Sequence, residues 1–64
     1  MTMTGKDFVN KLKKNGWTLD RIHGSHHIMV KDGYLPVTVP VHGNKDIPKG
    51  TFNQLLKDTG LKGK

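Results

Sequence analysis

The side chains best suited to chemistry in this 64-residue chain are four histidines: His23, His26, His27 and His42. The imidazole group has a reference pKa of about 6.5, so it both accepts and releases a proton near neutral pH. His26 and His27 directly follow Gly24-Ser25, a short turn that lets a substrate approach the backbone. With ammonium groups nearby, such imidazoles suit a phosphodiester substrate, because one group moves the proton and a cation stabilises the developing charge.

The predicted strands bring three of these histidines to one end of a sheet. In an antiparallel meander the start of the second strand lies beside the end of the third, so His26, His27 and His42 are expected to cluster there. Lys45 and Lys49 follow His42 in the chain and are expected nearby. Neighbouring strand residues point to opposite faces, so at most one of His26 and His27 faces a given site. Ordinary surface histidines without a catalytic role stay open as the alternative.

A metal site is the other chemistry that histidines support. His23 and His26 are three residues apart, but across a turn and not on a helix, and no third ligand is well placed. The chain has no cysteine, which excludes disulfides and cysteine-ligated zinc and suits a reducing compartment. We therefore expect no metal and no other cofactor.

Two helices are indicated near the ends of the chain. The first is expected to begin at Thr4, which can cap the helix with Asp7 three residues later, and to end at Asn15-Gly16. The second is expected from Pro48 or Lys49 to Thr59, because proline is tolerated in a first helical turn. Each helix has one apolar stripe at helical spacing, formed by Phe8, Val9 and Leu12 in the first and by Phe52, Leu55, Leu56 and Thr59 in the second.

Three strand-like runs separate the helices, over residues 17–22, 26–31 and 35–41, with a hairpin turn at Asp32-Gly33. In the third run every second residue from Leu35 to Val41 is apolar, so these residues share one face. Pro36 and Pro40 lie on the opposite face and cannot donate to a ladder, so this strand is expected at a sheet edge.

The second run also predicts which histidine is exposed. His26 shares a phase with Ile28 and Val30, which we expect to face the core. That phase favours exposure of His27, with Met29 also pointing outward.

The element order predicts an α+β fold in a single domain over residues 1–64. A helix, three antiparallel strands and a second helix (α-β-β-β-α) follow one another, joined by short links. Because each helix has one apolar stripe and the third strand one apolar face, both helices are expected on one face of the sheet. The other face is then free for a partner.

The charge balance indicates an anionic partner. Eleven Lys and Arg residues stand against five Asp residues, for a net charge of +6 and a pI near 9.9. This fits nucleic acid, an acidic protein or a membrane surface. No stretch approaches the ~18 apolar residues of a membrane span, and the first residues lack the pattern of a signal peptide. We therefore expect no membrane partner and a cytoplasmic location.

Several short motifs follow one another along the chain. They are Asn15-Gly16-Trp17, Gly24-Ser25-His26-His27, Val37-Thr38-Val39-Pro40, His42, Asp46-Ile47-Pro48-Lys49-Gly50-Thr51 and Gly60-Leu61. In this order, and in a chain of this size, they resemble the HicA family of small RNA-cleaving toxins from bacterial and phage toxin–antitoxin pairs. The resemblance spans nearly the full length of the chain.

This resemblance implies a fold like that of a double-stranded-RNA-binding domain and an endoribonuclease that acts on mRNA without a metal. It also implies a HicB-type antitoxin that blocks the active site. The family's catalytic histidine lies in the Gly-Ser-His turn, which is Gly24-Ser25-His26 here. Some members carry the functional histidine one place later, which corresponds to His27.

The expected chemistry is attack of a ribose 2′-hydroxyl on the adjacent phosphate, with His26 or His27 as general base, acid or both. The candidate substrate-binding groups are Gly24, Ser25, Arg21, His42, Lys45 and Lys49. We expect the free toxin to be a monomer. Two other functions stay open: a non-catalytic RNA-binding module of the same fold, and a basic domain that binds an acidic protein.

Overall fold

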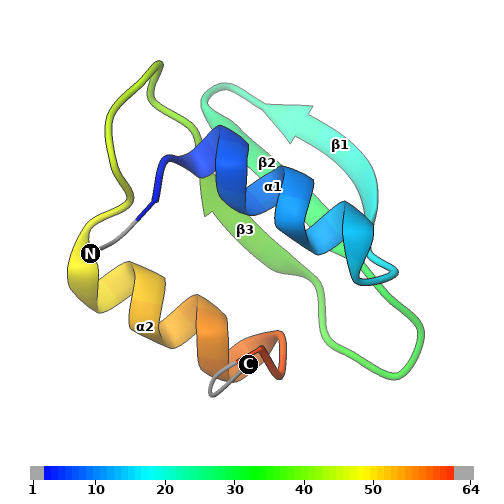
Figure 1. Ribbon diagram of the computed structural model, residues 1–64. Coiled ribbons are helices and arrows are strands. Elements are labelled where there is room, and N and C mark those ends of the chain that lie inside the picture. The colour runs from blue at the N-terminus through cyan, green and yellow to red at the C-terminus, as the bar shows by residue number, and fades with distance from the viewer. Residues whose placement is uncertain (1–2, 62–64) are drawn as a thin grey trace.

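The computed structural model describes residues 3–61. It consists of a three-stranded sheet with two helices on one of its faces (Figure 1). The strands are antiparallel in the order β1-β2-β3, so β2 is central and β3 is an edge strand. The predicted α-β-β-β-α order is confirmed. The elements are α1 (Gly5–Lys14), β1 (Thr18–His23), β2 (His26–Val30), β3 (Val37–Pro40) and α2 (Lys49–Asp58).

The first helix begins and ends where its sequence signals predict. The Thr4 hydroxyl accepts a hydrogen bond of 3.1 Å from the backbone N–H of Asp7, which satisfies one of the free donors of the first turn. At the other end Gly16 has a φ of 90°, and the N–H of Trp17 donates to the Leu12 carbonyl at 3.0 Å. This cap turns the chain back, so that Trp17 is buried at 3% exposure and leads directly into β1.

The hydrophobic core lies between the sheet and the two helices. Helix α1 packs against all three strands and α2 packs against β3. The rings of Phe8 and Phe52 meet edge to face with centroids 5.7 Å apart, which joins the helices to each other. Within residues 3–61, neither helix has the length and apolar character needed to cross a membrane. The buried apolar residues are Phe8, Val9, Leu12, Trp17, Met29, Val37, Val39, Ile47, Leu55 and Leu61.

The third strand is shorter than the predicted run. Residues 31–34 form a turn in which the N–H of Tyr34 donates to the Lys31 carbonyl at 3.1 Å. Pairing with β2 starts only at Val37, after Pro36, which has no N–H to donate. Leu35, expected to share the core-facing side, is therefore outside the strand and 84% exposed, and that part of the prediction is wrong.

The facing of the central strand is the reverse of the prediction. Met29 is fully buried against the helices, whereas Ile28 and Val30 are only half-buried on the opposite face. Both sides of this strand carry apolar residues, so the alternation of side chains alone does not indicate which side meets the helices. A bulge between Leu19 and Arg21 adds a further shift, because Leu19 pairs with Met29 but Arg21 pairs with Ile28.

The close approach of α1 to the end of β3 gives a prediction for stability. A Cβ atom on buried Gly5 would meet the Pro40 carbonyl oxygen and lie 2.9 Å from the Val41 Cα, so Gly5→Ala forces the helix off the sheet. We expect it to lower the free energy of unfolding by about 1–3 kcal/mol in urea titration. Gly50→Ala is the matched control, because helical Gly50 has no neighbour within 4 Å and alanine there should be neutral or stabilising. Equal stability of the two variants would contradict the packing argument.

Candidate active site

The hairpin between β1 and β2 fixes the positions of the candidate histidines. Gly24 has a φ of 62° in the two-residue turn, a conformation that favours glycine. Directly opposite each other across the turn are His23 and His26. The N–H of Val41 donates to the Ser25 carbonyl at 2.7 Å, which ties the chain after β3 to the same end of the sheet. His42 follows directly.

His26 and His42 line one hollow of about 320 Å³, here called the His26 hollow. His26 is exposed and lies on the sheet face opposite the helices, on which it pairs with Pro40 in the β2–β3 ladder. The predicted grouping of His26 and His42 is therefore observed. The complete lining is His26, Thr38, Pro40, His42, Pro48 and Thr51.

The His26 hollow is bordered by the start of α2. Pro48 is the N-cap residue and provides no side-chain hydrogen bond to the free N–H groups of the first turn, and no acidic residue lies in that turn. A helix of this kind carries partial positive charge at its N-terminus and favours a nearby anion. With Pro48 and Thr51 in the lining, the hollow combines two imidazoles with a helix end suited to negative charge.

His27 lies on the other face of the sheet and does not join this cluster. Its side chain is half-buried and lines a second hollow, of about 230 Å³, between α1 and the sheet, here called the His27 hollow. Its Nδ1 atom is buried without a hydrogen-bond partner. The expectation that His27 is the more exposed ring is therefore wrong, because His27 and Met29 lie on the side of β2 that faces the helices.

The comparison with known families covers almost all of the described residues. The family model of the HicA toxin of bacterial toxin–antitoxin systems matches residues 5–61. The chain belongs to the HicA toxin family. Among curated proteins, none matches the chain. Both hollows lie inside the matched range, and membership of this family gives the chain the role of a toxin in a toxin–antitoxin pair.

The three predicted substrate-binding cations are exposed and do not line the His26 hollow. Arg21 is 73% exposed and its Nε is 3.9 Å from the carboxylate of the neighbouring Asp20. Lys45 is exposed in a turn in which its N–H donates to the His42 carbonyl at 3.1 Å. Lys49 is exposed at the first position of α2. The structure therefore leaves all three side chains accessible to solvent.

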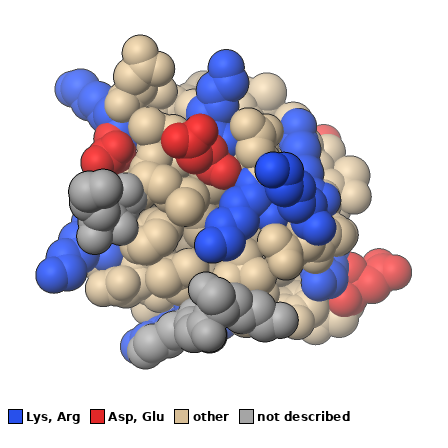
Figure 2. Space-filling model, viewed as in Figure 1, with Lys and Arg blue, Asp and Glu red and all other residues tan. Residues whose placement is uncertain are grey.

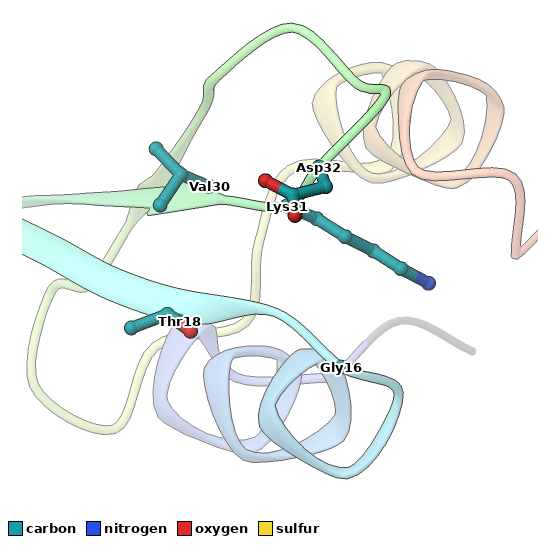
Figure 3. Close-up of a pocket in the computed structure, with 5 residues that line it drawn as sticks. All are labelled: Gly16, Thr18, Val30, Lys31 and Asp32. Carbon is teal, nitrogen blue, oxygen red and sulfur yellow. The ribbon is translucent and has the colours of Figure 1, made fainter.

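A third hollow has no histidine in its lining. It measures about 390 Å³ and is lined by Gly16, Thr18, Val30, Lys31 and Asp32 (Figure 3). The Lys31 side chain extends away from Thr18 and Val30 in this view, and its Nζ donates to the Asn15 carbonyl at 2.9 Å. That nitrogen also lies 5.2 Å from the centre of the Tyr34 ring, so Lys31 joins the end of α1 to the β2–β3 loop.

The lysines of α1 form a cationic surface for which the sequence predicted no role. Lys and Arg side chains gather over α1 in Figure 2, and the helix sequence contains Lys6, Lys11, Lys13 and Lys14. Two of these, Lys6 and Lys13, line the His27 hollow. Their spacing of seven residues places them on one helix face, but the sequence does not show that this face borders the sheet beside a histidine.

Within residues 3–61, no group of three or more metal-binding side chains is found.

Proposed function

We propose that this HicA toxin is an endoribonuclease that cleaves mRNA by acid–base chemistry at His26 and needs no metal ion. The observation that supports this most is the His26 hollow, in which two solvent-accessible imidazoles stand beside an uncapped helix N-terminus. Two imidazoles can supply a base and an acid to the same phosphodiester. The net charge of +6 attracts the RNA chain.

In the proposed reaction His26 accepts the proton of a ribose 2′-hydroxyl. The 2′-oxygen then forms a bond to the adjacent phosphorus, and the bond from phosphorus to the 5′-oxygen breaks. We assign to His42 the donation of a proton to that leaving oxygen, since it lines the same hollow. The products are a 2′,3′-cyclic phosphate and a 5′-hydroxyl. The N-terminus of α2 stabilises the negative charge that develops on the phosphoryl oxygens.

His26 suits this role better than His27 for a reason that lies in the second ring nitrogen. A histidine that moves a proton carries N–H groups on both nitrogens for part of its cycle. At His27 the Nδ1 atom is buried without a partner, so its N–H would have no acceptor. His26 is exposed, so water can satisfy whichever nitrogen the substrate leaves free. The resemblance of Gly24-Ser25-His26 to the family's catalytic turn supports the same assignment.

Substrate contacts in this proposal are mostly to phosphates. Arg21, Lys45 and Lys49 hold phosphates beyond the cleaved linkage, and the Gly24-Ser25 turn leaves the backbone accessible, because no atom lies within 4 Å of a Cβ built on Gly24. Binding through phosphates has little sequence preference and weakens steeply with salt. The toxin acts on mRNA in the cytoplasm as a monomer.

The protein partner in this proposal is a HicB-type antitoxin that covers the His26 hollow. The antitoxin is the expected second component because the chain belongs to a family of toxin–antitoxin systems. A partner seated there would keep RNA from both imidazoles. Added antitoxin should therefore stop RNA cleavage and protect His26 from a histidine-modifying reagent.

The direct test uses a labelled RNA with one mapped cleavage position. We expect a single 2′-deoxy substitution at that position to abolish cleavage of that linkage, because the attacking oxygen is missing. Addition of EDTA should leave the rate of cleavage unchanged, and the fragments should end in 2′,3′-cyclic phosphate by mass spectrometry. Cleavage of the deoxy linkage, or loss of activity in EDTA, would overturn this mechanism. RNA that is bound but stays intact would instead identify a non-catalytic RNA-binding module.

A further inference from the structure

The His27 hollow has the composition of an anion site. It lies between α1 and the sheet and has a volume of about 230 Å³, which corresponds to several water molecules at about 30 Å³ each. No carboxylate lines it. The polar lining residues are Lys6, Asn10, Lys13 and His27, and the apolar ones are Val9, Leu19 and Val41.

The helix places its polar side chains over the mouth of the hollow by simple spacing. Lys6, Asn10 and Lys13 are four and three residues apart, so they form one stripe along α1. All three are exposed, and Figure 2 shows the cationic surface over this helix. Asp7 is exposed and adjacent to Lys6, but does not line the hollow. An anion in the hollow would therefore meet two ammonium groups without a competing carboxylate.

His27 supplies a further donor from the sheet. Because its Nδ1 atom is buried without a partner, Nε2 is the nitrogen left for a ligand. In the neutral ring the hydrogen belongs on Nε2, since a buried N–H at Nδ1 would have no acceptor. The hollow then presents an imidazole N–H and two ammonium groups, with the Asn10 amide beside them. Several donors of this kind match a phosphate group, whose oxygens only accept.

We propose that the His27 hollow binds a phosphodiester group of the RNA chain, on the opposite side of β2 from the linkage that is cleaved. This assignment depends on the proposed function for the identity of the polymer. His26 and His27 have Cα atoms about 3.8 Å apart and face opposite sides of the sheet, so the two hollows flank the same point of β2. An RNA strand that passes over this end of the sheet contacts both. Lys6, Lys13 and His27 are then positioning residues.

Binding of a non-cleavable RNA, with every 2′-hydroxyl methylated, tests the site apart from the chemistry. We expect Lys6→Gln and Lys13→Gln each to weaken binding by about tenfold. Each should also reduce the slope of log K against log salt by about 0.7, the value for one lost phosphate contact on a single strand. Lys14→Gln is the matched control, because Lys14 has the same charge on the same helix but does not line the hollow, and binding should change less than twofold.

Kinetics on cleavable RNA separate this site from the His26 hollow. Lys6→Gln, Lys13→Gln and His27→Ala should raise KM and leave kcat within about threefold of the wild-type value, as expected when uniform binding is lost. Wild-type binding by both lysine variants, or equal weakening by Lys14→Gln, would overturn the proposal. If the wild-type protein binds RNA through Lys6 and Lys13 but never cleaves it, the phosphate site is supported and the nuclease function fails. Chemical-shift changes at His27 on addition of RNA, but not of inorganic phosphate at equal concentration, would identify the polymer as the ligand.

Discussion

Replacing His26 with alanine is expected to reduce RNA cleavage by about 10²–10⁴-fold, which is the usual contribution of one positioned acid–base group. The His26 side chain is exposed on the face of the sheet away from the core, so its removal should leave the fold intact. RNA binding should persist, because the proposed phosphate contacts come from other residues. The measurement is single-turnover cleavage of a labelled RNA, with growth arrest on induction as the readout in cells.

His23→Ala is the matched control for this variant. His23 is also exposed and lies directly opposite His26 on the same face of the sheet, but it does not line the hollow. Loss of the His23 side chain should change the rate of cleavage by less than about threefold. His42→Ala should instead lower kcat, as His26→Ala does, since both rings act on one linkage. Cleavage by His26→Ala at the wild-type rate would remove His26 from the mechanism. If His27→Ala instead lost kcat, the two adjacent histidines would exchange roles.

Local signals in the sequence predicted most of the fold. The Thr4 cap and the Gly16 ending fix α1 through interactions within a few residues, and both are confirmed. The two prolines correctly indicated that the third strand is at a sheet edge, because a missing N–H is a property of the residue itself. Leu35 shows the limit, since its place depends on where pairing with β2 begins.

The site was predictable only where topology alone decides it. His26 and His42 meet because a meander brings the start of one strand to the end of the next, whatever the side chains are. The facing of His26 and His27 depends on which side of β2 the helices cover, and Ile28 and Met29 are both apolar enough for either side. The role of Lys6 and Lys13 depends on how α1 crosses the sheet, which no spacing in the sequence specifies.

The packing of Phe8 leads to the second large effect, which is on stability. Phe8 is fully buried and its ring meets Phe52 of α2 at an angle of 71°. Phe8→Ala should lower the free energy of unfolding by about 3–5 kcal/mol. Total stabilities are about 5–15 kcal/mol, and a domain of this size buries only about 60% of its surface, so most of the stability is lost. We expect the melting temperature by circular dichroism to fall by at least about 12 °C.

Leu35→Ala is the matched control, because it also truncates an apolar side chain but at a position that is 84% exposed. It should change the free energy of unfolding by less than about 0.5 kcal/mol. The two rings of the Phe8–Phe52 pair hold α2 against α1, and the start of α2 borders the His26 hollow. Phe8→Ala should therefore lose toxicity together with helical signal, whereas His26→Ala should lose toxicity and keep both the signal and RNA binding. A Phe8→Ala variant that melts like the wild type would show that the helices are held in place by other contacts.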